Sequence, residues 1–322
     1  TGVADHVLAP REIAEELKRY ASYLASITNS QQRSISIDQL HEAIPVISKV
    51  LMDVTNHNFQ HYKQNTLTRR IRRRMHVLKH TNVETYVTLL KNDPEEPLTL
   101  FRELLISVTA FFRDSEAYEI LAGTVIPQIF GKRDQADTVR IWVPGCATGE
   151  EAFSLAMLCR EHMDTMDSPP EVQIFATDID ERALKISRLG TYPVGIEEDI
   201  SEARLKRFFI KRGKKYQVTK ELRELVLFSA HNLISDPPFS RLDLISCRNL
   251  LIYLGSHLQK KLIPLFHYAL RPSGFLILGP SENISSHGEL FRTLDTKYRI
   301  SQRRGTGVDA SAALNQEAGG AI

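Results

Sequence analysis

The stretch from Val139 to Met157 constrains this chain most. It begins as a short apolar run, turns at Pro144-Gly145, and reaches a second glycine, Gly149, before apolar residues at helical spacing. A strand, a glycine turn and a helix N-terminus form a place where backbone can approach a small ligand closely. A second apolar run, 172–176, ends in Thr177-Asp178. In doubly wound nucleotide-binding folds an acid at such a strand end binds ribose hydroxyls, so the ligand is predicted to contain adenosine.

The composition excludes several classes of protein. The 322 residues, 42% hydrophobic and 25% charged, are enough for one sizeable core and a smaller domain of a globular protein. No stretch approaches the roughly 20 apolar residues of a membrane span, so we expect no membrane insertion. The three cysteines, Cys146, Cys159 and Cys247, are odd in number and form no CxxC. We therefore expect neither disulfides nor a metal site, and a reducing, cytoplasmic compartment.

Residues 37–105 carry only helical periodicity and predict an N-terminal helical domain. One helix is indicated by Ile44, Ile47, Val50-Leu51 and Val54, and a second by Leu67, Ile71, Met75 and Leu78. Residues 1–30 do not match this pattern and form a separate segment with a short amphipathic helix and the start of a polar linker. Residues 305–322 are rich in Gly and Ala with few apolar anchors and predict a disordered tail.

Residues 106–304 alternate strands and helices. Strands are predicted at 139–143, 172–176, 225–229, 242–246 and 275–278, with a helix at 258–270 and a last antiparallel edge strand at 298–302. This alternation predicts an α/β fold, a mostly parallel Rossmann-like sheet with helices on both faces. Within an excess segment at about 190–224, a β-hairpin turning at Gly213 predicts a small inserted β-subdomain.

The polar side of the second helix is strongly basic. It holds Arg69, Arg70, Arg72, Arg73, Arg74 and Lys79, with no acid. Three interpretations stay open at this point: a nucleic-acid patch, a docking surface for an acidic protein, and a solvated face with some arginines on neighbouring carboxylates. Single-stranded nucleic acid is disfavoured, because the helix offers no aromatic side chain on which bases could stack.

The residues around the glycine turn narrow the choice of cofactor. A dinucleotide site needs GxGxxG with an acid about 20 residues on, whereas Asp178 follows Gly145 by 33 residues. A P-loop needs a lysine after its last glycine, but Gly149 precedes Glu150-Glu151. Two carboxylates would repel phosphates, although they also suit a helix N-terminus. They fit a cationic ligand better, and S-adenosylmethionine carries a sulfonium and an ammonium group.

One further motif competes with this interpretation. Residues 235–239, SDPPF, resemble the [DN]PP[YF] element of enzymes that methylate amino groups. In those enzymes the element directly follows the fourth strand, whereas here it precedes the strand LDLISC. We therefore interpret it as a turn, which weighs against N-methylation of nucleic acid or glutamine.

Five motifs carry a family resemblance. VTAFFRD, PGCATGEEAFSLAM, FATDID, LISCRNLLIYL and GFLILGPSEN occur in the order seen in CheR-type methyltransferases, and the resemblance runs from about residue 38 to 304. These enzymes methylate glutamate side chains of bacterial chemoreceptors. The resemblance implies an S-adenosylmethionine methyltransferase domain at 106–304, preceded by an all-α domain and carrying a β-subdomain. It also implies S-adenosylhomocysteine as the product and a receptor's cytoplasmic helical bundle as partner, with no nucleic acid.

The resemblance also implies roles for single residues. Those implied to bind the cofactor are Ser107, Thr109, Arg113, Gly145, Glu151, Asp178, Asn232, Leu233, Arg248 and Asn249. Arg113 and Tyr253 would orient the reacting carboxylate, and Arg70, Arg73 and Arg74 would dock the acidic receptor helices. Family members often have asparagine where this chain has Ser107, so that contact departs from the pattern.

The first 25 residues resemble a different domain. The pattern TG-ADxVL-P-x-x-I is similar to the C-terminal end of a receptor methylesterase, and the spellings GPSEN and CRNLLIYL occur in methyltransferases fused to one. The chain is therefore expected to be the methyltransferase part of a methylesterase–methyltransferase fusion. The alternative to an enzyme is an S-adenosylmethionine-binding signalling module that is catalytically inactive and acts through protein interaction.

Overall fold

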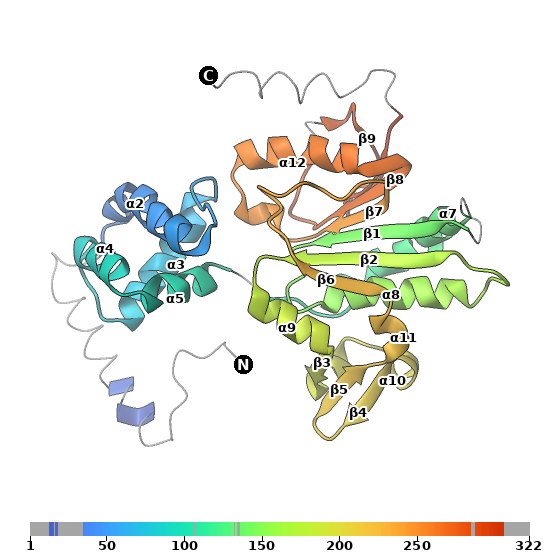
Figure 1. The fold of residues 1–322 in the computed structure, drawn as a ribbon, viewed down its shortest axis with the longest axis horizontal. Coiled ribbons are helices and arrows are strands. Elements are labelled where there is room, and N and C mark those ends of the chain that lie inside the picture. Colours follow the sequence, from blue (N-terminus) through green and yellow to red (C-terminus); the bar gives the residue numbers. More distant parts are fainter. Residues whose placement is uncertain are drawn as a thin grey trace. The chain divides into compact units, whose positions relative to one another are not determined.

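The structure is a computed structural model of the chain and describes residues 13–15, 17–18, 35–105, 107–131, 133, 136–284 and 287–305. The chain forms two compact units, Thr1–Ile106 and Ser107–Ile322, each with its own hydrophobic core (Figure 1). Most of the methylesterase-like segment and the predicted tail after residue 305 lie outside the described residues.

The described part of the first unit is helical, as its periodicity predicts. Its helices are α2 (Ile37–Thr55), α3 (Gln64–Val77), α4 (Val83–Asn92) and α5 (Glu95–Leu104). Ile44, Ile47 and Leu51 lie on the buried face of α2, whereas Val54 is 46% exposed. Leu67, Ile71 and Met75 bury the apolar face of α3 in the same core. The apolar faces of the helices hold this unit together, because they remove these side chains from water.

A cluster of Arg74, Glu96 and Tyr86 links three of these helices. The guanidinium of Arg74 donates to Glu96 of α5 at 2.8 and 2.7 Å, and to Glu103 at 3.3 Å. The hydroxyl of Tyr86, on α4, donates to Glu96 at 2.9 Å. The Arg74 side chain is only 15% exposed. The charge of Arg74 is therefore used within the helical unit, on carboxylates that the sequence pattern of α3 alone could not reveal, and its role in docking stays a prediction.

The second unit is built on a seven-stranded sheet. Its strands are β1 (Thr138–Pro144), β2 (Glu171–Asp178), β6 (Val226–Ala230), β7 (Leu242–Cys247), β8 (Leu270–Leu278), β9 (Phe291–Asp295) and β10 (Ile300–Arg303). They lie in the order β6-β2-β1-β7-β8-β10-β9, and the first five are parallel (Figure 1). The predicted mostly parallel sheet is confirmed.

The last strand differs from its prediction in one respect. β10 is antiparallel to β8, as expected, but it does not form the edge of the sheet. It lies between β8 and β9, and β9 is the edge strand. The sequence 291–295, FRTLD, has its apolar residues at Phe291 and Leu294, three apart, and so lacks the alternation of a strand, because an exposed edge strand buries little of its surface.

Helices precede the first strand of this sheet and connect its later strands. They are α6 (Ser115–Ile120), the π-helix η1 (Leu121–Val125), α7 (Ile126–Phe130), α8 (Glu150–Met163), α9 (Glu181–Leu189), the 3-10 turn η3 (Leu251–Tyr253) and α12 (Ser256–Ala269). α8 lies between β1 and β2 in the chain, and eight consecutive residues of it, 152–159, are buried. Since α8 is buried nearly all round, its first turn is fixed against the ends of the neighbouring strands.

The inserted β-subdomain is present as predicted. It consists of β3 (Thr191–Pro193), η2 (Val194–Glu198), α10 (Glu202–Phe208), β4 (Phe209–Arg212), β5 (Lys215–Val218) and α11 (Lys220–Arg223). The hairpin β4–β5 turns at Gly213, whose φ of 60° suits glycine. Phe111 packs edge-on against Tyr192 and Phe209, at 4.9 and 5.6 Å between ring centroids, and so attaches the subdomain to the core of the unit.

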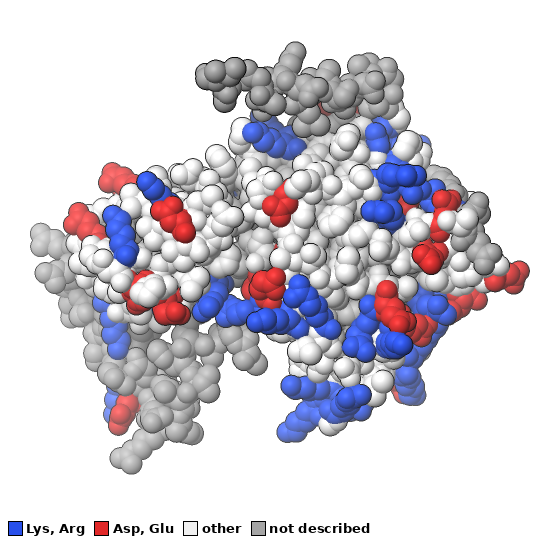
Figure 2. All heavy atoms as spheres, in the orientation of Figure 1, with Lys and Arg blue, Asp and Glu red and all other residues white. Residues whose placement is uncertain are grey.

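Lys and Arg side chains gather at the hairpin end of this subdomain. Figure 2 shows them over β4 and β5, and the exposed members are Lys211, Arg212, Lys214 and Lys215. Lys211 has an acidic neighbour at short range, since it donates to Glu197 at 2.9 Å. The hairpin tip is therefore a basic surface. Separately, no helix in the described ranges is both long and apolar enough to cross a membrane.

The Arg74 contacts predict the stability of the helical unit. Arg74→Ala leaves Glu96 as a nearly buried carboxylate without its cationic partner, which costs on the order of 3 kcal/mol. Urea denaturation followed by circular dichroism measures this loss. Arg69→Ala, an exposed change on the same helix, is the matched control and should lie within about 0.5 kcal/mol of wild type. Equal effects of the two changes would show that the Arg74–Glu96 pair does not stabilise the unit.

Candidate functional site

The strand order places a ligand site at one edge of the seven-stranded sheet. From β1 the chain passes through α8 to β2 and then outward to β6, whereas β7 and β8 lie on the other side of β1. The direction of the connections therefore reverses between β1 and β7. Open α/β sheets bind ligands at such a point, outside the carboxyl ends of the strands. The glycine turn after β1 and the residues after β2 and β7 all lie at this edge.

The glycine turn has the conformation that its sequence predicts. Gly145 and Gly149 have φ of 69° and 95°. A Cβ on Gly149 would stand 2.8 Å from Cβ of Ser187, so no larger residue fits there. Asp178, at the end of β2, accepts from the N–H of Ala147 at 2.8 Å and from that of Asp180 at 2.9 Å. The Asp178 carboxylate therefore holds the turn, and its remaining lone pairs can accept hydroxyl groups of a ligand.

Glu151 stands in the first turn of α8. Its carboxylate accepts from the hydroxyl of Ser246 on β7 at 2.6 Å, which ties the helix to the neighbouring strand. Burial raises the pKa of Glu151, and the charge of Arg248 opposes that rise. Glu150, the preceding residue, accepts from Thr148 at 2.6 Å, and burial likewise raises the pKa of Glu150. Burial is also the main reason why the pKa of Asp178 is raised.

Arg248 follows β7 and is only 7% exposed. Its Nη2 donates to the carbonyl oxygen of Arg113 at 2.8 Å and to the carboxylate of Asp114 at 2.6 Å. Its Nη1 lies 3.4 Å from the hydroxyl of Tyr118. The guanidinium thus fastens the loop before α6 to the end of β7. A direct contact of Arg248 with a cofactor stays a prediction.

The loop at 107–114 is further held at Phe112. The Phe112 N–H donates to the hydroxyl of Ser154 on α8 at 3.0 Å. Phe112 and Asp114 have φ of 48° and 59°, in the left-handed region that non-glycine residues rarely adopt. The Arg113 side chain between them is exposed, and its Nη1 donates to the carbonyl of Val108 at 3.3 Å. The predicted site residues Ser107 and Thr109 lie on the same loop and are half-buried.

The residues after β6 form another side of the candidate ligand site. Asn232 donates its N–H to Asp236 at 2.8 Å, and its side-chain oxygen accepts from the N–H of Ile234 at 3.0 Å. Leu233 is buried. Phe239 stacks on Phe175 at 4.5 Å. The DPPF segment is therefore a turn that precedes β7, as the sequence indicated, and it presents no carbonyl cradle after that strand.

Asn249 and Tyr253 lie on the loop that continues from Arg248. Asn249 has φ of 60°, and Tyr253, half-buried, ends the turn η3. The loop is bound by Glu282, whose carboxylate accepts from its backbone N–H groups. Sequence reasoning did not single out Glu282 or the hydroxyls of Ser154 and Ser246. A charged residue within the short GPSEN segment after an apolar strand was the available signal for Glu282.

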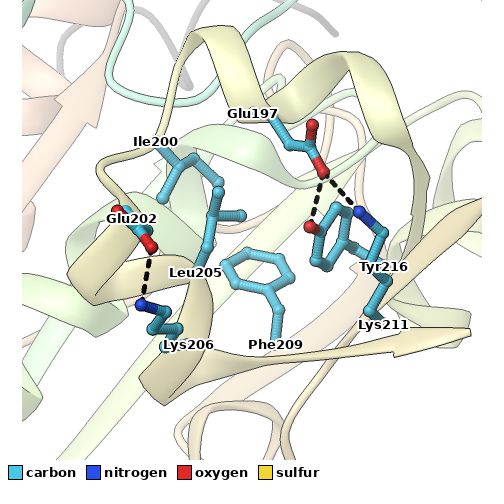
Figure 3. A pocket seen from close by; sticks show the side chains of 8 residues that line it. All are labelled: Glu197, Ile200, Glu202, Leu205, Lys206, Phe209, Lys211 and Tyr216. Carbon is cyan, nitrogen blue, oxygen red and sulfur yellow. Dashed lines mark hydrogen bonds and ion pairs between the residues drawn. The ribbon is translucent and has the colours of Figure 1, made fainter.

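A separate pocket of about 480 Å³ lies in the β-subdomain (Figure 3). It is lined by side chains of η2, α10, β4 and β5, among them Phe209 and Tyr216. Glu197 accepts from the Tyr216 hydroxyl at 2.5 Å and from Lys211 at 2.9 Å across its rim. None of its lining residues belongs to the glycine turn or to the strand ends that surround it, so we do not assign the chemistry to this pocket. Within the described residues, no group of three or more His, Cys, Asp or Glu could hold a metal ion.

Several known proteins are similar to this chain. An uncharacterized 104.1 kDa protein of Rhodobacter capsulatus is 40% identical over 81% of this chain, which spans only 27% of that protein. Chemotaxis protein methyltransferase 2 of Pseudomonas aeruginosa is 34% identical over 70% of this chain and 80% of its own length. The chemotaxis protein methyltransferase of Listeria innocua is 31% identical over 69% of this chain and 83% of its own.

Two family models match consecutive parts of the chain. The all-alpha domain of CheR methyltransferases matches residues 42–105, and their SAM-binding domain matches residues 107–300. The residues present fit S-adenosylmethionine, because the buried carboxylates at the glycine turn suit its cationic groups. The chain belongs to the CheR methyltransferase family and is an S-adenosylmethionine-dependent methyltransferase.

Proposed function

We propose that this chain is a protein-glutamate O-methyltransferase that acts on glutamate side chains of chemoreceptor-like signalling proteins. The observation that carries the proposal is Glu151, a buried acid on the first turn of α8 beside the glycine turn, tied to Ser246 and facing Arg248. In a family whose relatives are named chemotaxis protein methyltransferases, this acid-lined turn suits a sulfonium donor. Residues on the adjoining loops then bind and orient the glutamate carboxylate that accepts the methyl group.

The cofactor, when bound, supplies a methyl group on a positively charged sulfur. We assign its ribose hydroxyls to Asp178 and its adenine to Asn232 and Leu233, which follow β6. The methionine part is assigned to Gly145 and Glu151. Ser107, Thr109 and Arg113 reach the same ligand from the loop before α6, and Arg248 with Asn249 completes the pocket. These assignments rest on matching motifs and on the gathering of the β-strand ends at one edge.

A glutamate carboxylate is ionised at neutral pH and needs no general base to act as a nucleophile. The protein must remove water from it and hold one oxygen in line with the donor methyl, roughly 3 Å away. Charge is neutralised as the reaction proceeds, so strong binding of either ion would slow it. We therefore assign Arg113 and Tyr253 the role of orienting donors rather than of acid or base. The exposure of Arg113 is compatible with contact to an incoming substrate.

This chain has two basic surfaces that suit binding to the acidic helices of a receptor. Arg70 and Arg73 remain on the polar side of α3, Arg73 exposed and Arg70 half-buried. The hairpin β4–β5 presents its own lysines and arginines on the β-subdomain (Figure 2). Opposite charge steers association and fixes orientation more than it adds affinity. This supports a receptor's cytoplasmic helical bundle as partner, and with it a cytoplasmic location.

We further propose that residues 1–25 are the end of a methylesterase domain in a longer fusion protein. The support is the sequence pattern of this segment. The much longer Rhodobacter relative is compatible with a multidomain arrangement. Isolation of the full-length chain and an assay for methyl-ester hydrolysis would test the proposal, and absence of any esterase sequence upstream would refute it.

The chemistry is tested by the stability of the product. Methyl-labelled S-adenosylmethionine and an acidic receptor helical fragment should give protein-bound label that mild base releases as methanol, because carboxyl esters are base-labile. Arg113→Ala should lower label transfer mainly through kcat. Base-stable label would instead indicate nitrogen methylation. No transfer, with cofactor binding intact by calorimetry, would favour the inactive signalling module.

The raised pKa values predict a pH dependence of cofactor binding. The pKa values of Glu150, Glu151 and Asp178 lie above their ordinary values of 4.5, 4.5 and 3.8, because burial disfavours their charged forms. Groups whose pKa is raised on folding stabilise the protein at low pH and lose that contribution as pH rises. A cationic ligand needs the ionised carboxylates. Between pH 8 and pH 5.5, the cofactor-free protein should therefore gain stability from these groups while affinity for S-adenosylmethionine falls.

Calorimetry at the two pH values measures the affinity, and thermal unfolding measures the stability. S-adenosylhomocysteine lacks the sulfonium charge, so its affinity should change less than that of S-adenosylmethionine. Glu151→Gln removes one titrating acid and should flatten the profile. An affinity for S-adenosylmethionine that does not vary with pH would contradict the electrostatic assignment.

The docking surface is tested by Arg70→Ala/Arg73→Ala. Each surface charge contributes roughly 0.5–1 kcal/mol to association, so KM for the receptor should rise about 5- to 30-fold at low salt and depend less on salt. Affinity for the cofactor should not change. Lys49→Ala/Lys91→Ala removes two exposed charges from other helices of the same unit and serves as the control. A KM change equal to that of the control would exclude docking through α3.

A further inference from the structure

We propose that Glu282 is the positioning residue for the loop that carries Arg248, Asn249 and Tyr253. The proposal rests on the function proposed above and adds to it a residue that touches neither cofactor nor substrate. Glu282 follows β8, and its side chain is only 3% exposed. A carboxylate so far removed from water must be satisfied by the protein, and the groups that satisfy it reveal what it does.

The partners of Glu282 are backbone N–H groups on two segments. Its Oε1 accepts from the N–H of Leu251 at 2.6 Å, and its Oε2 from that of Asn249 at 3.0 Å. Oε2 also accepts from the N–H of Gly279, directly after β8, at 2.5 Å. One carboxylate therefore joins the segment after β7 to the segment after β8. These are adjacent parallel strands, and both segments start at the carboxyl edge where the site lies.

The loop would not hold its shape without this anchor. Asn249 has φ of 60°, a left-handed conformation that asparagine adopts more readily than most residues but that still needs its surroundings to fix it. The N–H groups of Asn249 and Leu251 are not bonded within a helix or strand, so without Glu282 they would need water or another acceptor. Arg248 lies directly before the anchored residues and Tyr253 two residues after them. A shift of the anchor moves both functional side chains.

Gly279 shows how closely the anchor is packed. A Cβ on Gly279 would stand 2.9 Å from the backbone nitrogen of Asn249, from its side-chain nitrogen, and from Oε2 of Glu282. No carbon can remain at that distance, so Gly279→Ala must displace the loop or the carboxylate. It disturbs the anchor while leaving the charge of Glu282 in place, which makes it an independent second variant.

The matched control is Asp243, at the other end of the same central strand. It is 4% exposed, and its carboxylate accepts from the N–H of Arg140 at 2.8 Å and from the side chain of Arg133. Asp243 is thus a buried carboxylate on β7 with a backbone N–H partner, far along the strand from Cys247, where the loop begins. Asp243→Asn should cost stability without moving the loop.

The experiment compares Glu282→Gln, Gly279→Ala and Asp243→Asn for kcat, for the Kd of S-adenosylhomocysteine, and for urea stability. A misplacement of about 1 Å lowers a rate roughly 100-fold. Glu282→Gln and Gly279→Ala should therefore lower kcat at least 10-fold more than they weaken cofactor binding, and their effects should combine less than additively. Asp243→Asn should keep its kcat at temperatures where it is folded. A Glu282→Gln enzyme with kcat within twofold of wild type, or with a loss equal to that of Asp243→Asn, would overturn the proposal.

A second readout does not depend on activity. Amide hydrogen exchange of the peptide 248–254 should be at least 10-fold faster in Glu282→Gln than in wild type or Asp243→Asn, because the carboxamide nitrogen replaces one of the two acceptor oxygens and so leaves at least one N–H of the anchor without its acceptor. If the wild-type protein transfers no methyl group, the proposed function fails, and the exchange result decides separately whether Glu282 holds the loop. Unchanged exchange would overturn the positioning role whatever the activity.

Discussion

The buried guanidinium of Arg248 is the interaction on which the site depends. It joins the end of β7 to the backbone of Arg113 and the carboxylate of Asp114, which lie more than 130 residues earlier in the chain. A buried arginine needs partners for its donors, and here the loop before α6 supplies both acceptors of Nη2, whereas Nε is buried without a hydrogen-bond partner among the described residues. The fold of the sheet and the conformation of the loop are thereby coupled, since neither the arginine nor the loop can move without leaving the other unsatisfied.

At the same edge of the sheet, acidic side chains are buried and poorly solvated. Glu151 and Asp178 each accept hydrogen bonds from neighbouring elements, yet burial dominates and raises the pKa of each. Buried carboxylates are costly to ionise without a nearby positive charge. A cationic ligand supplies that charge, so such a site binds a cation more favourably than a neutral ligand. That gain belongs to binding of the donor. It diminishes as charge is neutralised in the reaction, so binding the sulfonium too strongly would slow methyl transfer.

Local patterns predicted much of this protein, and contacts between distant segments account for the rest. Alternating apolar runs predicted the parallel strands, and the spacing of Leu67, Ile71 and Met75 predicted α3, because both periodicities are local. Strand order depends on contacts between distant segments. The sequence therefore led us to expect β10 at the edge of the sheet, whereas β9 is the edge strand. Arg74 turns to Glu96 across 22 residues for the same reason. The motifs identified Glu151 and Asp178, but the hydroxyl of Ser246 reaches Glu151 across 95 residues, which no pattern records.

The backbone at the site explains why positioning residues are needed. Among the described residues, nine that are not glycine have positive φ, and four of them, Phe112, Asp114, Ala147 and Asn249, lie on loops at the carboxyl edge. Each such residue is unfavourable by itself and persists only where its surroundings fix it. Ser154, Arg248, Asp178 and Glu282 make those fixing contacts. The loops that face the ligand are therefore held by buried polar groups behind them, so that side chains such as Arg113 remain available to substrate while the backbone beneath them stays in place.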